Sequence, residues 1–387
     1  MPVDPARADA GRVWTLARRA TAPHPAPCPA PDAGGAPLDD ASSHLMVALA
    51  ERHRLPGLLA AGLSGMDVRL SAAAAAALRS LALRDAMITT RLAARMFSLL
   101  DAFAAEGISA RVMKGLPVAA LAYGRLGLRH VRDVDFLVPE DDFVAAHEVI
   151  LAHGFTPMVD LGRVAVADLP RYAHELPYSD DQGSIVELHA ARSAHRGGRD
   201  HAAAPLATVQ VMGRAVPVDP FPDIFVHLCR HGASHAWCLL KWLADISHLI
   251  ASPSARFDWE AVAETTRRSG SARHVGLALA LAGAVHDVTP PPALAGFVGT
   301  VPSGLVHRIV AMLADPMSGG PTPMAMARLE VGLASGPGAK AAALRDFMLT
   351  PTLQDARDWP LPHGLLWAAR PVLYAARRLR RASAGVT

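Results

Sequence analysis

The most constraining feature of this chain is a pair of aspartates, Asp133 and Asp135, inside an apolar run that ends at Pro139. A β-strand points residues i and i+2 to the same face, so we expect the two carboxylates to stand side by side. Val134 and Phe136 would then pack into the core. Two like charges on a mostly buried strand repel each other. A divalent cation between them removes this conflict, and hard oxygen ligands suit Mg²⁺.

The other interpretation of the Asp-x-Asp pattern is a solvated turn, because the pattern is short. Two neighbouring features favour the strand and a functional role. The Phe-Leu-Val-Pro run that follows is typical of a strand, and Arg129 and Arg132 ahead of it supply cations that can bind phosphate. The pattern therefore predicts metal-dependent phosphoryl or nucleotidyl transfer.

Composition places the chain among globular proteins. Its 387 residues allow two domains and a sizeable core, and 51% of them are hydrophobic and 19% charged. A net charge of +3 gives no dense basic patch, so nucleic acid is not an expected partner. The three cysteines form no CxxC pair, which argues against a disulfide framework or a zinc cluster. We find no secretory signal and no transmembrane segment, and we expect a cytoplasmic protein.

The order of patterns predicts an α+β fold, with a small mixed-sheet core between an N-terminal helical segment and a C-terminal helical domain. Residues 1–41 are rich in proline and alanine and are expected to be disordered. Residues 42–107 have helical spacing, 108–222 alternate strand and helix, and 223–387 return to helical spacing. The tail, residues 365–381, reads as a basic amphipathic helix. We favour its docking on the core over peripheral membrane contact.

Further polar residues lie where a transferase site needs them. The run Ser184–His189 alternates like a strand and places Glu187 and His189 on one face, so Glu187 is the natural third carboxylate. Lys114-Gly115 follows an apolar run and precedes a helix. It offers a close backbone approach to phosphate together with one point charge.

This order of motifs resembles the nucleotidyltransferase superfamily related to DNA polymerase beta. The resemblance is narrower to the bacterial uncharacterised nucleotidyltransferase family, over roughly residues 85–290. Members of that family often accompany natural-product gene clusters, including those for lasso peptides. The motifs that carry the resemblance are Met113-Lys114-Gly115, Leu128-Arg129, Arg132 to Val138 and Glu187-Leu188-His189.

The resemblance implies an enzyme that uses Mg²⁺ and ATP or another NTP. It would transfer a nucleoside monophosphate to a hydroxyl or phosphate of a small-molecule or peptide acceptor. Asp133 and Asp135 would bind the metal, and Glu187 would be the third ligand or the base that accepts the acceptor's proton. The residues expected to bind the nucleotide are Lys114, Gly115, Arg129, Arg132 and His189.

One departure from the superfamily concerns phosphate binding. Gly115-Leu116 stands where Gly-Ser is usual, so the phosphate-binding hydroxyl is missing, and Lys114 is its candidate replacement. Two alternatives stay open. The same fold can serve a phosphotransferase that moves the γ-phosphoryl group to a peptide or sugar, since both reactions need the same metals and cations. The other alternative is a non-catalytic nucleotide-binding partner protein.

A later helical stretch carries polar residues at regular spacing. His227, His231 and His235 recur at i, i+4 and i+8, without a carboxylate that would complete a zinc site. We expect them to flank a packed helix or to line the substrate cleft. Lys241 and Asp245, also four residues apart, are interpreted as a helix ion pair.

Overall fold

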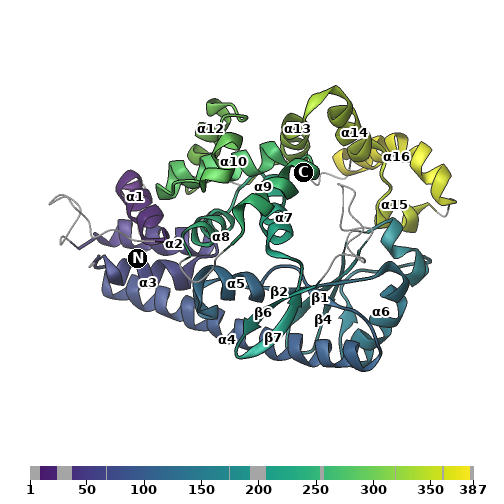
Figure 1. Cartoon of the computed structure of the whole chain (residues 1–387), viewed down its shortest axis with the longest axis horizontal. Coiled ribbons are helices and arrows are strands. Elements are labelled where there is room, and N and C mark those ends of the chain that lie inside the picture. The colour runs from purple at the N-terminus through teal and green to yellow at the C-terminus, as the bar shows by residue number, and fades with distance from the viewer. Residues whose placement is uncertain are drawn as a thin grey trace. The chain divides into compact units, whose positions relative to one another are not determined.

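A computed structural model of the chain has an α+β fold with a small mixed five-stranded sheet, preceded and followed in the sequence by helices (Figure 1). The predicted fold class is confirmed. Two compact units make up the chain: one comprises residues 1–95, 112–134 and 205–329, and the other residues 96–111, 135–204 and 330–387. The structure describes residues 9–23, 37–66, 68–173, 175–191, 206–252, 257–318, 320–359 and 361–383.

The strands found in these described residues all fall inside the predicted core, 108–222. The sheet has the order β1-β2-β5-β4-β3, and β6 and β7 form a separate antiparallel hairpin. The strand bounds are β1 Arg111–Val112, β2 Asp133–Val138, β3 Thr156–Pro157, β4 Leu176–Ser179, β5 Ile185–Ala190, β6 Ala207–Val211 and β7 Arg214–Val218.

Strand β2 is the carboxylate strand that the sequence predicts, and it is covered on both faces. Val134, Phe136 and Val138 are buried, as expected for one face of a strand in a core. The ring of Phe136 packs edge-on against Phe103, with ring centroids 5.3 Å apart. Leu137, on the opposite face, is also buried. Burial on both faces explains the nearly continuous apolar run around the aspartates.

The β4–β5 hairpin fixes which side chains share a face of β5. In its turn, Asp180 accepts hydrogen bonds from the amides of Gln182 (3.0 Å) and Ser184 (2.7 Å). Asparagine and aspartate commonly stabilise turns in this way. The resulting antiparallel register pairs Leu176 with Leu188 and therefore Pro177 with Glu187. Sequence analysis predicted β5 but did not predict its partner β4.

The first four helices are α1 Ala10–Ala20, α2 Asp40–Arg52, α3 Pro56–Gly65 and α4 Ala72–Ala105. The predicted disorder of residues 1–41 is wrong for α1, which begins at the capping side chain of Asp9 and buries Val13 and Leu16 in a core shared with α2 and α3. The proline-rich stretch beyond α1 masked its helical spacing. Residues 24–36 lie outside the described residues.

Helices inside the core region connect the strands. The bounds are α5 Leu116–Tyr123 and α6 Phe143–Ala152, with single 3₁₀ segments η2 Leu126–Leu128, η3 Glu140–Asp142 and η4 Val166–Arg171. Helix α5 follows Gly115 and helix α6 ends just before His153 and Gly154, as the sequence predicts. Asp142 precedes α6, but its side chain makes no capping hydrogen bond.

The C-terminal part is helical in the described residues, as predicted. No single described helix has the length and apolar composition to cross a membrane, although the bent pair α11–α12 passes that test jointly. The bounds are α7 Phe221–Ser234, α8 Leu240–Ala251, α9 Trp259–Arg268, α10 Ala272–His286, α11 Pro292–Val298, α12 Ser303–Ala314, α13 Pro323–Leu333, α14 Gly336–Leu349, α15 Leu353–Asp358 and α16 His363–Ser383.

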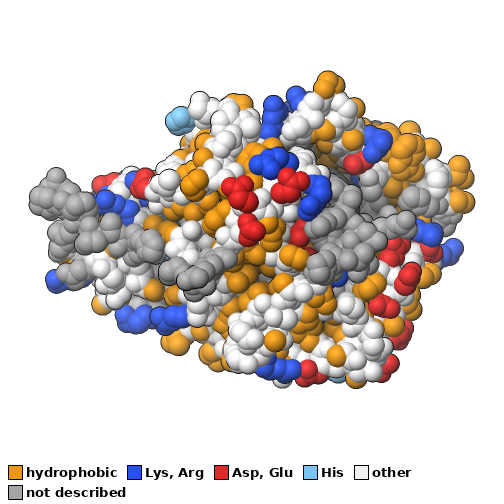
Figure 2. All heavy atoms as spheres, in the orientation of Figure 1, with side chains coloured by type: hydrophobic (Ala, Val, Ile, Leu, Met, Phe, Trp, Pro, Cys, Tyr) orange, Lys and Arg blue, Asp and Glu red, His pale blue; other side chains and the backbone are white. Residues whose placement is uncertain are grey.

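The predicted basic tail forms most of helix α16. One side chain ties it to the preceding helix: Arg370 donates to the buried carboxylate of Asp355 at 2.8 Å. Apolar side chains are exposed over α16, as Figure 2 shows, among them Leu365, Trp367 and Val372. The helix is therefore attached to its own unit by an ion pair and leaves part of its apolar surface open.

Replacing a buried leucine of α1 tests the correction at the N-terminus. Leu16→Ala should lower the free energy of unfolding by about 2–4 kcal/mol, because it removes buried methyl groups from a packed core. Urea denaturation measures the change. Leu83→Ala is the matched control, since Leu83 is 65% exposed on α4. Equal stability of the two variants would contradict the packing of α1.

Candidate active site

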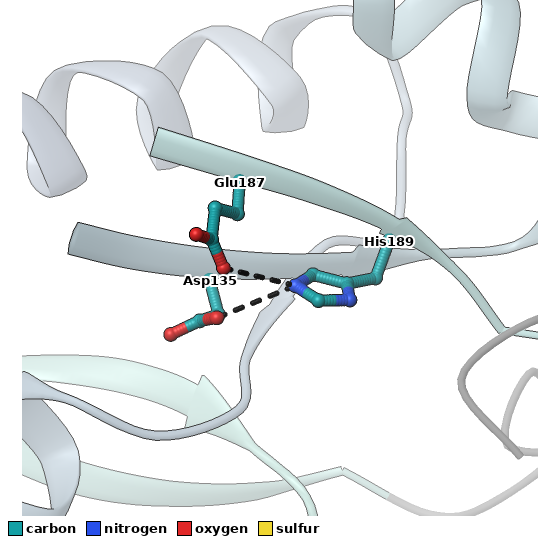
Figure 3. A group of neighbouring side chains, drawn as sticks. All are labelled: Asp135, Glu187 and His189. Atoms are coloured by element: carbon teal, nitrogen blue, oxygen red, sulfur yellow. Dashed lines mark hydrogen bonds and ion pairs between the residues drawn. The ribbon is translucent and has the colours of Figure 1, made fainter. Parts of the chain in front are cut away.

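Three polar side chains from neighbouring strands converge in one unit of the chain. Asp135 comes from β2, and Glu187 and His189 come from β5. Their potential ligand atoms all lie within 4.8 Å of one another. The Nε2 atom of His189 is 3.3 Å from Oδ1 of Asp135 and 3.8 Å from Oε2 of Glu187, as the dashed lines in Figure 3 show. The three side chains point toward a common centre.

Backbone pairing brings these residues together. The amide of Ala191, at the end of β5, donates to the carbonyl of Val138, at the end of β2, over 2.8 Å. Alternation along β5 then places Glu187 and His189 on one face while Val186 and Leu188 pack into the core. Sequence analysis predicted the shared face of Glu187 and His189. It also expected Glu187 to complete the site of Asp135, and the structure brings these two side chains together.

Burial strengthens the repulsion between the carboxylates of Asp135 and Glu187. Asp135 is fully buried, His189 is 7% exposed, and the Glu187 side chain is 14% exposed. Two carboxylates at such close range in a low-dielectric site need positive charge nearby. His189 supplies that charge only when protonated. A divalent cation supplies it at any pH at which the carboxylates are ionised.

The donor set fits a divalent metal ion. Two carboxylates provide the hard oxygen ligands that suit Mg²⁺ and Mn²⁺, and the imidazole nitrogen of His189 adds a donor that first-row transition metals accept more readily than Mg²⁺. This is the one group of three or more His, Cys, Asp or Glu side chains with metal-binding geometry in the described residues. We therefore take it as the candidate metal centre.

The turn at Gly115 is the predicted phosphate-binding segment, and its backbone requires glycine. Gly115 precedes α5 and has φ +71°, a left-handed conformation that favours glycine. A Cβ atom there would lie 3.4 Å from the carbonyl oxygen of Asp133, so the turn also passes close to the start of β2. The first turn of α5 follows directly, and helix N-termini can bind phosphate through backbone amides, although Pro117 in this turn has none. The neighbouring Lys114 is partly buried.

A buried ion pair supports this turn. Arg129 donates through Nε and Nη2 to the two carboxylate oxygens of Asp245, at 2.9 and 2.8 Å, and both side chains are at most 4% exposed. Arg129 also donates through Nη1 to the carbonyl of Gly115, at 3.3 Å. The hydroxyl of Tyr123 completes the network by donating to Asp245 at 2.9 Å. The network joins the Gly115 turn to α5 and α8.

The charge of the buried Arg129 guanidinium is stabilised by its contact with the Asp245 carboxylate. Burial alone would lower the pKa of Arg129, but the Asp245 carboxylate raises it above its ordinary value. Burial and then Asp245 raise the pKa of the Tyr123 phenol well above its usual range. The Arg129 guanidinium therefore stays charged although it is buried. Because the guanidinium is occupied by Asp245 and Gly115, its role in nucleotide binding stays a prediction and would be exerted through the turn.

The other predicted site residues lie elsewhere on the chain. Asp133 is the first residue of β2, half-buried, and Arg132 precedes it with an exposed side chain. Both belong to the unit that contains Gly115 and Arg129, whereas Asp135 belongs to the unit with Glu187. Their metal-binding and nucleotide-binding roles stay predictions.

The predicted ion pair between Lys241 and Asp245 is wrong. Asp245 pairs with Arg129, and Lys241 donates to the carbonyl of His130 at 3.4 Å. Both residues are buried in α8 among leucines and alanines. Their position on the apolar face of the helix was the signal that they serve a buried network rather than a solvated pair.

The histidines of α7 form an aromatic cluster. His231 and His235 lie with ring centroids 4.8 Å apart, and His235 stacks on Trp242 of α8 at 5.0 Å. His227 is stacked near His231 at 6.1 Å. The metal group found in the described part of the chain contains none of them. They flank packed helices, one of the two arrangements expected from the sequence.

Removing the carboxylate from the buried pair tests its contribution. Asp245→Ala should lower the free energy of unfolding by about 3–5 kcal/mol, because it leaves the Arg129 guanidinium buried and uncompensated. Chemical denaturation measures the loss. The exposed pair of Arg171 and Asp168 gives the control, since Asp168→Ala should cost at most about 1 kcal/mol. Similar losses in both variants would refute the importance of burial.

Comparison with known proteins agrees with this geometry. A search of curated proteins finds no match to the chain. A family model described as uncharacterised nucleotidyltransferase matches residues 39–287. That span contains the Gly115 turn, β2, β5 and the helix that carries Asp245. The chain belongs to this family of uncharacterised nucleotidyltransferases.

Proposed function

We propose that this chain is a Mg²⁺-dependent nucleotidyltransferase. It transfers a nucleoside monophosphate from ATP or another NTP to a hydroxyl or phosphate of a small-molecule or peptide acceptor. The observation that carries the proposal is the convergence of Asp135, Glu187 and His189 in a member of a nucleotidyltransferase family. A peptide acceptor would suit a role in natural-product biosynthesis.

The cation would be held by side chains of β2 and β5. Asp135 and Glu187 supply carboxylate oxygens, and Asp133, two residues before Asp135 on the same strand, supplies a further one. His189 either donates its ring nitrogen to the cation or orients Asp135 through their 3.3 Å contact. Such a cation neutralises charge on the phosphoryl oxygens.

In the proposed reaction an oxygen of the acceptor attacks the α-phosphorus of the NTP. A new P–O bond forms, the bond from the α-phosphorus to the bridging oxygen of the β-phosphate breaks, and pyrophosphate leaves. The proton of an acceptor hydroxyl passes to a carboxylate oxygen of Glu187, which is the more exposed of the two carboxylates in the group. General base catalysis of this kind needs a carboxylate within reach of the hydroxyl.

The nucleotide would be bound by the Gly115 turn and its neighbours. The amides at the start of α5 bind phosphate, and Lys114 adds a positive charge. Arg129 acts as a positioning residue because its guanidinium holds the Gly115 carbonyl. Arg132 has an exposed side chain and contacts the phosphates directly.

Nucleotide binding tests the proposal without knowledge of the acceptor. The wild type should bind at least one of ATP, CTP, GTP and UTP in a Mg²⁺-dependent manner, measured by calorimetry. Asp135→Asn should weaken binding about tenfold or more, because it removes a charged ligand. Asp181→Asn, at an exposed turn residue, should leave binding unchanged. Absence of nucleotide binding with and without Mg²⁺ would contradict the proposal.

Metal binding gives an independent readout. The electron paramagnetic resonance signal of free Mn²⁺ should fall on titration with wild-type protein as the ion binds. His189→Gln should weaken Mn²⁺ binding by about 10–100-fold if the ring orients or ligates, since supporting groups of metal sites have effects of that size. Unchanged Mn²⁺ affinity in both His189→Gln and Glu187→Gln would exclude this cluster as the metal site.

A further inference from the structure

Two arginines in the unit that contains Gly115 form no direct ion pair with a described residue. The guanidinium groups of Arg54 and Arg132 make no hydrogen bond or ion pair with any residue that the structure describes. They are close enough for Arg132 to lower the pKa of Arg54, after the larger effect of burial. Two neighbouring guanidinium groups repel each other, and on Arg54 the charge of the nearby Asp133 acts against that repulsion. A bound anion would relieve that repulsion.

Tight backbone packing brings these arginines near each other from distant parts of the sequence. Arg54 lies in the turn between α2 and α3, and Arg132 lies between η2 and β2. A Cβ atom at Gly57, in the first turn of α3, would overlap with the carbonyl oxygen of Gly127 in η2. The absence of a side chain at Gly57 therefore permits the α2–α3 turn to lie against η2.

The backbone of Arg54 is also unusual. Its φ of +57° lies in the left-handed region, which costs a residue other than glycine about 1–2 kcal/mol. Its amide donates to the carbonyl of Glu51 at 3.1 Å, which holds the turn. A strained conformation that is held by its surroundings is a feature often found at functional sites.

Lys241 adds a third cation with unfilled donors. Its side chain is 8% exposed, and among the described residues its ammonium has one hydrogen-bond partner, the carbonyl of His130 at 3.4 Å. An ammonium group has three N–H donors, so two stay unfilled in a largely buried position. Burial, and next the charge of Arg129, lower the pKa of Lys241 to about 7. An anion beside the ammonium would accept hydrogen bonds from its unfilled donors and would also offset the cost of burying its charge.

The balance of charge around these cations favours an anion. Asp245 is used by Arg129 in the bidentate pair and does not pair with Lys241. Asp133 is the carboxylate whose charge acts on both Arg54 and Lys241. Besides the Asp245 carboxylate, which is held by Arg129, one carboxylate, Asp133, therefore stands against the three cations Arg54, Arg132 and Lys241. The excess of positive charge suits a compact ligand that carries several negative charges.

We propose that Arg54, Arg132 and Lys241 form the binding site for a polyphosphate group, either the β- and γ-phosphates of the nucleotide or the released pyrophosphate. The inference rests on the proposed nucleotidyltransferase function and adds Arg54 and Lys241 to its binding residues. Two guanidinium groups offer the forked donors that suit phosphate oxygens, and the ammonium adds a point charge. The Arg129–Asp245 pair keeps α8, and with it Lys241, attached to the Gly115 turn.

A nucleic-acid backbone fits this cluster less well. Binding of a nucleic acid uses basic residues spread along a face or groove, and the net charge of +3 over 387 residues leaves little for such a stripe. Arg54 and Lys241 instead both feel the charge of Asp133, the residue that follows Arg132 at the start of one strand. Convergence favours a small polyanion.

Calorimetry with sodium pyrophosphate tests the site, first without and then with Mg²⁺. We expect wild-type protein to bind pyrophosphate, and Lys241→Met and Arg54→Gln each to weaken binding about tenfold or more, since each removes a charged hydrogen-bond donor. Lys340→Met and Arg79→Gln are matched controls at exposed positions and should bind as the wild type does. Thermal unfolding checks that each variant is folded.

The outcomes separate this inference from the proposed function. Folded Lys241→Met and Arg54→Gln proteins that bind pyrophosphate as the wild type does would overturn the site, even if Asp135→Asn abolishes nucleotide binding. Failure of the wild type to bind pyrophosphate in either condition would also overturn it.

The source of the polyphosphate is resolved by a second titration. If both variants lose affinity for pyrophosphate and for the NTP that the wild type binds, the cluster holds the nucleotide's phosphate tail. If they lose affinity for pyrophosphate alone, the cluster holds the released product. Either result supports the inference.

Discussion

The buried ion pair of Arg129 and Asp245 is the interaction on which the unit around Gly115 depends. It joins residues 116 positions apart and is at once bidentate and nearly inaccessible to water. Removing two charges from water is costly, and the cost is recovered only with good geometry and further hydrogen bonds. The carbonyl of Gly115 and the hydroxyl of Tyr123 provide those bonds. One network therefore holds the Gly115 turn, helix α5 and helix α8 together.

Local patterns were sufficient to predict much of the sheet. Alternation with a period of two located β2 and β5, and Gly115 marked the start of α5, because these signals depend on residues adjacent in the sequence. The shared face of Glu187 and His189 followed from the same alternation. The short strands β3, β4 and β6 were missed. Two residues in β3, or a strand that contains Pro177, give too little alternation to recognise.

Long-range pairing decides the contacts that local patterns do not show. Arg129 was expected to bind phosphate because it precedes the aspartates; that role stays a prediction, and its guanidinium pairs with a carboxylate on α8. Lys241 and Asp245 have the spacing of an ion pair, but each has a partner on a distant segment. Spacing along one helix shows which side chains share a face. It does not show which element covers that face, and here the buried partners decide the roles.

These long-range pairings suggest how the chain compensates for the hydroxyl that is missing after Gly115. Leu116 is buried, so the residue that replaces the usual serine packs into the protein instead of facing phosphate. Positive charge is then needed from other segments, and the α2–α3 turn and α8 both bring it to the start of β2 through Arg54 and Lys241. The helical parts on either side of the sheet region in the sequence thus contribute to the proposed site itself. A polyphosphate site built in this way depends on long-range packing, and Gly57 and Asp245 are as necessary to it as the cations they position.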